Sequence, residues 1–229
     1  MSKLCIITAR GGSKRIPKKN IKEFLGKPII AYSIEAALNS VIFDEVMVST
    51  DSDEIAEIAK RYGAKVPFLR SSENADDHAT TRDVCKEVLD AYKAEGREFD
   101  MFACIYPTAP FLTAERLKTA VETLEGADAY SLVPVVQFSF PPQRGVIVKN
   151  GLMEWVNPEF AQTRSQDLEP VYHDAGQFYI LRTEAFLREF ALVTSKTVPF
   201  VLSEEEVQDI DNYSDWALAE MKYKLIREK

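Results

Sequence analysis

The sequence predicts an α/β fold built on a mainly parallel sheet. Two observations lead to this prediction: short apolar runs rich in β-branched residues recur along the chain, and longer stretches of helical periodicity separate them. Strands that alternate with helices form right-handed βαβ units, which place their strands parallel. The length of 229 residues suits one domain and buries enough surface to fold without disulfides or structural metals.

The first half of the chain shows this alternation most clearly. Strands are expected at 3–9, 45–50 and 101–106. Helices are expected at 28–39, 51–62 and 80–95. Pro28 stands in the first turn of its helix, where proline is tolerated, and Gly63 follows the second helix as a stop signal.

The second half begins in the same way and then changes. A helix capped by Thr113, without a full capping box, is expected at 113–124, and a strand at 129–135. Between 137 and 172 the alternation stops, and proline pairs and an Asn-Gly step between alternating apolar residues predict a β-hairpin with a two-residue turn.

The alternation then returns with a strand expected at 176–182 and a closing helix at 211–229. We therefore expect a single α/β domain made of residues 1–136 and 173–229, with residues 137–172 inserted into it.

The charge and the cysteines narrow the class of protein. A formal net charge of -8 argues against a general nucleic-acid binder, which would present a wide basic face. No apolar stretch approaches the roughly 20 residues of a membrane span, and the N-terminus lacks the apolar core of a signal peptide. Cys5, Cys85 and Cys104 are odd in number and widely spaced, which is typical of reduced core thiols in a cytoplasmic protein.

A glycine-rich, basic loop follows the first predicted strand. The segment ITARGGSKRIPKKN contains Gly11, Gly12 and Ser13 between Arg10 and Lys14. Glycines let backbone N–H groups approach an anion, and ligands of open α/β sheets bind at the carboxyl ends of the strands. The segment matches neither the Walker A pattern nor the dinucleotide fingerprint. We interpret it as a phosphate-binding loop; a solvated basic turn is the alternative.

Two pairs of aspartates have the spacing of a metal site. Asp209 and Asp211 stand two apart, so that in an extended segment both carboxylates point the same way and suit Mg²⁺ bridged to phosphate oxygens. The alternative is that Asp211 or Asn212 caps the last helix. For Asp51 and Asp53, which precede a helical pattern, capping is the favoured interpretation.

Five motifs occur in order over nearly the whole chain: ARGGSKRIPKKN, VSTDSDEIAEIA, VPFLR, IYPTAPFLTA and the late DID. In these the sequence resembles the cytidylyltransferases that activate nonulosonic (sialic-type) acids. The resemblance implies a Rossmann-like nucleotide-diphosphosugar transferase fold with a small β-hairpin insertion that forms a homodimer. It also implies the reaction of CTP with a 2-keto sugar acid to give the CMP-sugar and pyrophosphate, with Mg²⁺ as cofactor.

The resemblance assigns roles to individual residues. Expected catalytic residues are Arg10, Lys19, Asp209 and Asp211, of which the two aspartates would also bind the metal. Expected nucleotide-binding residues are Arg10, Gly11, Gly12, Ser13, Lys14, Asn20, Arg70 and Thr81. Expected sugar-binding residues are Tyr106, Arg164, Gln166, His173, Asp174 and Gln177.

Several of the sugar-binding assignments have alternatives. Arg164 could grip the substrate carboxylate or form a surface ion pair with Asp167 or Glu169. His173 could contact the sugar, with a low expectation that it acts as a base, and Asp174 could simply orient its neighbours. His78, in an acidic loop, is expected to be solvated, and two histidines without a cysteine cluster make zinc an unsuitable metal.

The choice of sugar rests on two departures from sialic acid members of the family. Tyr106 stands where they commonly have Gln, and His173 to Gly176 replace an Arg-Pro-Asn-Gly-like stretch. Together with TRSQDLEPVYHDAGQFYI, these favour pseudaminic acid; N-acetylneuraminate and legionaminate are the alternatives. A non-catalytic nucleotide-binding module and a glycosyltransferase are the competing classes, and the latter lacks its usual mid-chain Asp-x-Asp here.

Overall fold

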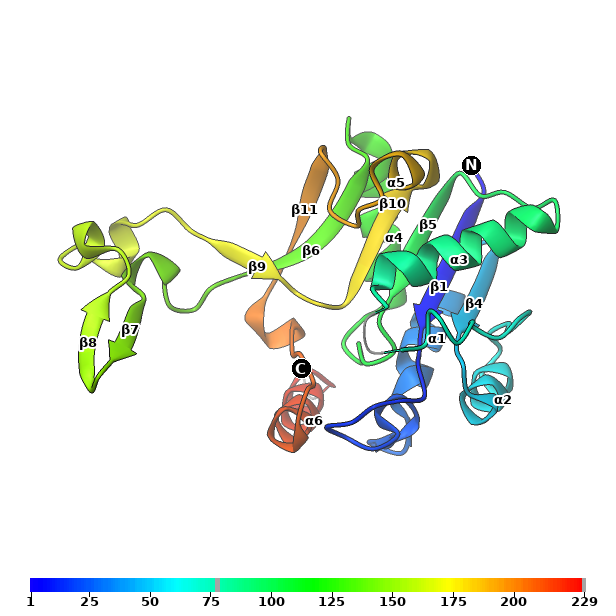
Figure 1. Cartoon of the computed structure of the whole chain (residues 1–229), viewed down its shortest axis with the longest axis horizontal. Helices are drawn as coiled ribbons and strands as arrows, with labels where there is room; N and C mark the ends of the chain where they lie inside the picture. Colours follow the sequence, from blue (N-terminus) through cyan, green and yellow to red (C-terminus); the bar gives the residue numbers. More distant parts are fainter. Residues whose placement is uncertain (77–78, 228–229) are drawn as a thin grey trace.

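The computed structural model describes residues 1–76 and 79–227, and its centre is a twisted sheet (Figure 1). Within the described residues this sheet has seven strands in the order β11-β6-β10-β5-β1-β4, with β9 paired to β6. The strands are β1 (Lys3–Thr8), β4 (Glu45–Ser49), β5 (Met101–Ile105), β6 (Ser131–Gln137), β9 (Tyr172–Asp174), β10 (Phe178–Arg182) and β11 (Thr197–Leu202).

Five of the seven described strands of this sheet run in the same direction, which confirms the predicted fold class with its mainly parallel sheet. β1 pairs in parallel with β4 and β5, and β11 pairs in parallel with β6. β10 is the exception at the centre, because it lies antiparallel between β5 and β6. The strand β11 was not predicted. It is partly exposed and contains Pro199, so its apolar alternation is weaker than that of the buried strands.

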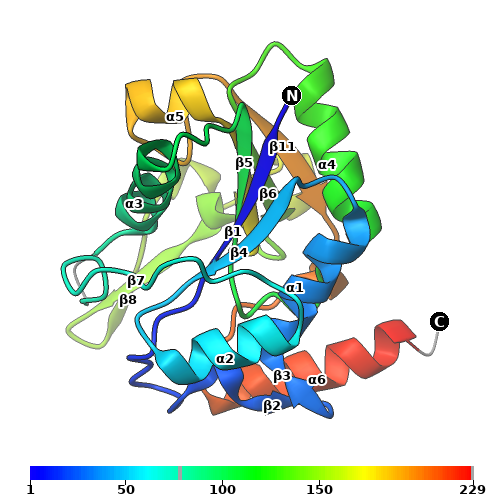
Figure 2. The same ribbon diagram turned by 90° about the vertical axis from the view of Figure 1, so that its right-hand side faces the viewer.

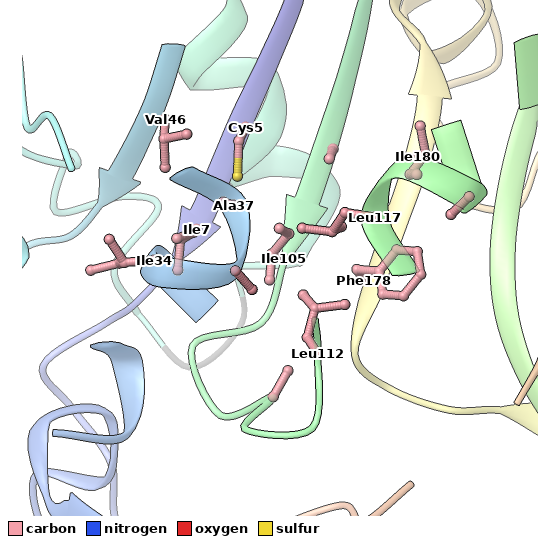
Figure 3. Packing of buried hydrophobic residues seen from close by; sticks show 14 of the residues in the cluster. Cys5, Ile7, Ile34, Ala37, Val46, Ile105, Leu112, Leu117, Phe178 and Ile180 are labelled. Atoms are coloured by element: carbon pink, nitrogen blue, oxygen red, sulfur yellow. The ribbon is translucent and has the colours of Figure 1, made fainter. Parts of the chain in front are cut away.

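Helices cover both faces of the sheet (Figure 2). They are α1 (Ile29–Ser40), α2 (Asp53–Arg61), α3 (Thr81–Ala94), α4 (Ala114–Gly126), α5 (Thr183–Glu189) and α6 (Tyr213–Arg227). One buried cluster joins α1, α2 and α4 to residues such as Cys5 and Ile7 on one face of the sheet (Figure 3). A second joins α3 and α5 to Leu4 and Ile6 on the other face, because successive side chains of a strand alternate between faces.

The helix starts follow the predicted caps. Ser52 accepts a hydrogen bond from the amide of Ile55, and Thr113 accepts one from the amide of Arg116. Asn212 caps α6 by accepting from the amide of Asp215 at 3.0 Å. The closing helix therefore begins two residues later than expected, and of the two caps that the alternative named, Asp211 or Asn212, the structure has Asn212.

The last helix packs against a small antiparallel pair, β2 (Glu23–Phe24) and β3 (Lys27–Pro28). Phe24 meets Tyr32 of α1 and Trp216 of α6 edge to face, with ring centroids 5.5 Å apart in both cases. Cys5, Cys85 and Cys104 are free and buried, as predicted for core thiols. In the part of the chain described, no helix is both long and apolar enough to be a candidate membrane span.

The segment between β6 and β9 extends away from the sheet as an arm (Figure 1). It contains the predicted hairpin, made of β7 (Val146–Lys149) and β8 (Leu152–Trp155). Asn150 and Gly151 have φ angles of 52° and 78°, the two positive values that the tight turn requires. Apolar side chains on both strands are exposed, among them Val148 and Leu152. The arm's expected role in dimerisation stays a prediction.

Candidate active site

A cavity of about 680 Å³ opens at the carboxyl ends of β1 and β5. The loop after β1, the start of α3 and the loop after β5 form its walls. Its lining residues are Thr8, Arg10, Ser13, Lys14, Arg15, Ile16, Lys19, Asn20, Arg70, Ala79, Thr81, Val84, Tyr106, Pro107 and Thr108. Ligands of open α/β sheets bind at this edge, so we call it the nucleotide cavity.

The charge of the nucleotide cavity suits a polyphosphate. Five of the described residues that line it are arginine or lysine, and none of these lining residues is a carboxylate. Arg10, Ser13, Lys14, Lys19 and Asn20 all line it, so the loop is placed where the phosphate interpretation requires, and phosphate binding by it stays a prediction. Arg15 was missed, although the basic run contained the signal for it.

The glycine loop is held in place by β4 and the turn after it. The Gly11 amide donates to Asp51 Oδ1 at 2.8 Å, and Asn20 Nδ2 donates to the Arg10 carbonyl at 2.8 Å. A Cβ on Gly11 would lie 3.3 Å from Ser52 Cβ, so this glycine permits the close approach. Asp51 thus anchors the loop, while Ser52 caps α2. Gly11 and Gly12 shape the loop but do not line the cavity.

Arg70 is buried behind the loop. Its Nε donates to Ser49 Oγ at 3.0 Å and its terminal nitrogen to the Ser49 carbonyl at 2.7 Å. Burial lowers the pKa of the guanidinium, and the negative charges of Asp51 and Glu87 act in the opposite direction. These contacts fix the side chain at the cavity wall before any ligand arrives.

The Asp209–Asp211 segment meets the basic loop directly. Lys19 Nζ donates to the Ile210 carbonyl at 2.6 Å and lies 3.6 Å from Asp211 Oδ1. Arg15 pairs with the same Asp211 oxygen at 2.8 Å. Burial and the nearby charge of Asp211 raise the pKa of Asp209, and Lys19 acts against this. Asp211 thus lies against two cations of the nucleotide cavity, and carboxylates there are of the type that Mg²⁺ takes, one or two together with substrate phosphates.

A second cavity of about 330 Å³ lies on the other side of that segment. Asp209 lines it together with His173, Asp174, Gly176, Gln208 and Lys222. His173 and Asp174 were predicted to face the sugar, and both are here. Lys222 was missed because it lies in α6, outside all five motifs, and the docking of that helix brings it to this wall.

Three predicted sugar-binding residues do not line the second cavity. Tyr106 lines the nucleotide cavity instead of the second one, because it directly follows β5. Gln177 is 2% exposed and donates through Nε2 to the Glu206 carbonyl at 2.6 Å, so it lies behind the walls. Arg164 lies in the arm and forms the surface ion pair with Asp167, at 2.7 Å, that was its alternative.

Two further expectations complete the comparison with the sequence. Gln166 is exposed in the same arm and lines neither cavity. Thr81 lies where expected, at the start of α3 in the nucleotide cavity, with Oγ1 3.4 Å from the Tyr106 hydroxyl. His78 lies outside the described residues.

The fold is shared with solved nucleotidyltransferases. A CMP:2-keto-3-deoxy-manno-octonic acid synthetase complexed with CTP superposes with a TM-score of 0.72 over 100% of both chains, at 17% identity. A 4-diphosphocytidyl-2C-methyl-D-erythritol synthase from Anaerococcus prevotii superposes with a TM-score of 0.64 over 97% of this chain and 98% of the other. At such low identity these likenesses show the class of fold.

Sequence similarity is more specific. Residues 4–208 match the family described as Cytidylyltransferase, and the chain belongs to that family. It is 42% identical to the pseudaminic acid cytidylyltransferase of Campylobacter jejuni, over 100% of this chain and 99% of that one. It is 38% identical to the CMP-N,N'-diacetyllegionaminic acid synthase of Legionella pneumophila, over 98% of this chain and 97% of the relative.

Proposed function

We propose that this protein transfers CMP from CTP to the anomeric hydroxyl of pseudaminic acid and releases pyrophosphate. The observation that carries the proposal is the contact of Lys19 with the Ile210 carbonyl and with Asp211. Lys19 lines the nucleotide cavity, and Asp209, in the segment that it contacts, lines the second cavity, so the two cavities are neighbours. The full-length similarity to a pseudaminic acid cytidylyltransferase supports this choice of sugar.

The side chains of the nucleotide cavity act mainly by position and charge. Phosphoryl-type transfer needs an aligned nucleophile and neutralised phosphate oxygens more than it needs a protein nucleophile. Arg10, Lys14 and Lys19 line the space where a triphosphate fits, and they offset the charge that develops on the departing pyrophosphate. Arg70, fixed on Ser49, is preorganised for the same task.

Asp209 and Asp211 would hold Mg²⁺. When bound, the cation would screen phosphate charge and help to stabilise the leaving group. In the structure Arg15 and Lys19 neutralise Asp211. Arg15 and Lys19 also line the nucleotide cavity. If Asp211 binds the metal, these two side chains would be released to contact phosphate oxygens of the substrate.

The second cavity would hold the sugar acid. It is lined by three carboxylates, from Asp174, Glu204 and Asp209, against one lysine, Lys222. A substrate carboxylate therefore needs further positive charge there. Mg²⁺ held by Asp209 and Asp211 would supply part of it, and an arginine from the arm of a second copy of the chain would supply the rest.

A homodimer built through the arm is part of the proposal. A lone two-stranded hairpin is marginally stable in water, and both strands of this one expose apolar side chains, Val148 by 74% and Leu152 by 71%. Arg164 lies between β8 and β9, within the arm that leaves its own sheet (Figure 1), so we assign it to the second cavity of a partner. Light scattering on wild type and on Val148→Lys/Leu152→Lys tests this; a monomeric wild type would contradict it.

The test of the function is pyrophosphate release from CTP and Mg²⁺ with three sugar acids in parallel. We expect release with pseudaminic acid and little with N-acetylneuraminate or legionaminate. Preference for either of the others keeps the chemistry and changes the substrate, and the legionaminic relative makes that sugar the second candidate. No release with any sugar, together with no CTP binding by calorimetry, would refute the enzyme assignment.

A further inference from the structure

Tyr179 occupies the space between the two cavities without lining either of them. It lies on β10, is 6% exposed and packs among the residues under α3. Its hydroxyl donates to Asp174 Oδ2 at 2.5 Å. Its ring lies 5.8 Å from that of Tyr106, at an angle of 69° between the planes.

Each neighbour of Tyr179 belongs to a different cavity. Tyr106 lines the nucleotide cavity, where its hydroxyl is 3.4 Å from Thr81 Oγ1. Asp174 lines the second cavity. A chain of contacts therefore runs from Thr81 through the two tyrosines to Asp174, and Tyr179 is its buried member.

Asp174 uses both carboxylate oxygens to hold its turn. Oδ1 accepts from the Gly176 amide at 2.7 Å, while Oδ2 accepts from Tyr179. Gly176 has a φ of +62°, so the turn between β9 and β10 is tight. The Asp174 carbonyl contacts His173 Nδ1 at 2.9 Å, which places the imidazole on the same wall. The hydroxyl of Tyr179, which comes from the neighbouring strand β10, therefore helps to fix the position of Asp174 in the wall of the second cavity.

We propose that Tyr179 is a positioning residue for the sugar acid. Its hydroxyl holds Asp174 and thereby the wall of the second cavity that carries His173. Its ring packs against Tyr106, and this contact with the nucleotide cavity does not depend on the hydroxyl. This inference rests on the proposed function, since it assigns a role within the same reaction. Burial, Tyr106 and Asp174 together raise the pKa of Tyr179, so the hydroxyl stays a donor at neutral pH.

The test is Tyr179→Phe, which keeps the ring and removes one hydrogen bond to a charged acceptor. Such a bond is worth about tenfold in an equilibrium constant or somewhat more. We expect KM for pseudaminic acid to rise about tenfold and the melting temperature to fall by a few degrees, with kcat and KM for CTP nearly unchanged. Tyr130→Phe, which removes a hydroxyl outside both cavities, is the matched control and should change none of these.

A double-mutant cycle tests whether Tyr179 acts through Asp174 or through a general loss of rigidity around the two cavities. In an Asp174→Ala background, Tyr179→Phe should have little further effect on the KM for the sugar acid, because its acceptor is gone. An unchanged KM for the sugar acid in Tyr179→Phe would overturn the inference. So would an equal rise in both KM values or an effect that simply adds to that of Asp174→Ala. A wild-type protein inactive with every sugar acid refutes the proposed function, and the inference with it; activity in the wild type with no selective effect refutes the inference alone.

Discussion

Glu45 at the start of β4 offers a prediction whose size follows from the structure. The residue is 4% exposed. Its Oε2 accepts from Arg97 at 2.7 Å and from Lys65 at 2.9 Å, and its Oε1 accepts from the Tyr92 hydroxyl. Burial alone would raise the pKa, but these hydrogen bonds outweigh it and lower the pKa from 4.5 to about 2.

The shift converts into a pH-dependent stability. A difference of about 2.5 pKa units corresponds to about 3 kcal/mol of free energy of unfolding. Because the folded-state pKa lies below the unfolded one, this contribution is complete above about pH 4.5 and is lost as the pH falls through about 2.

The perturbation is Glu45→Gln, which keeps the shape and removes the charge. Urea unfolding at pH 7 should show a loss of about 3 kcal/mol relative to wild type, and the gap should narrow steadily between pH 5 and pH 2.5. Glu122→Gln, on the exposed side of α4, is the control and should cost little at any pH. A gap that stays constant with pH, or one below about 0.5 kcal/mol at pH 7, would refute the electrostatic account.

Three functional predictions follow from the nucleotide cavity and the arm. Asp211→Asn should lower kcat at least a hundredfold and raise the Mg²⁺ concentration needed for half-maximal rate, since it removes a proposed metal ligand; near-normal turnover would argue against that role. Gly11→Ala, which pushes a methyl against Ser52, should raise KM for CTP several-fold without changing KM for the sugar acid. Arg164→Ala should raise KM for the sugar acid about tenfold only if a dimer forms. Mixed dimers of the Arg164→Ala chain and an Asp211→Asn chain should regain part of the activity, because one of their two sites combines the intact Asp211 of one chain with the intact Arg164 of the other. No recovery in confirmed mixed dimers would count against a site shared across the interface.

Much of the fold could be predicted because local patterns and tertiary packing agree. The strands β1, β4 and β5 are continuous apolar runs, and such runs arise where both faces of a strand are covered. The hairpin of the arm was predictable from Asn150-Gly151 because few dipeptides adopt two positive φ angles. α5 and β11 were missed because one is short and the other lies at the sheet edge with a mixed pattern.

The candidate site also has parts that local sequence patterns predict and parts that they do not. The sequence predicts a phosphate loop after β1, since glycines beside cations directly after a strand are typical of anion sites at the carboxyl edge of a sheet. It also determined that Asp209 and Asp211 could act as a pair.

What these groups face depends on how distant parts of the chain pack together. The tertiary structure brings Lys19 against Ile210, 191 residues further along the chain, and it places Tyr106 in the nucleotide cavity and Tyr179 beneath both cavities. It also carries Arg164 out on the arm into an ion pair with Asp167. The physical reason is that strand and turn patterns are set by neighbours in sequence, whereas a binding site is made by strand order and helix docking, which bring together residues with no local signal in common.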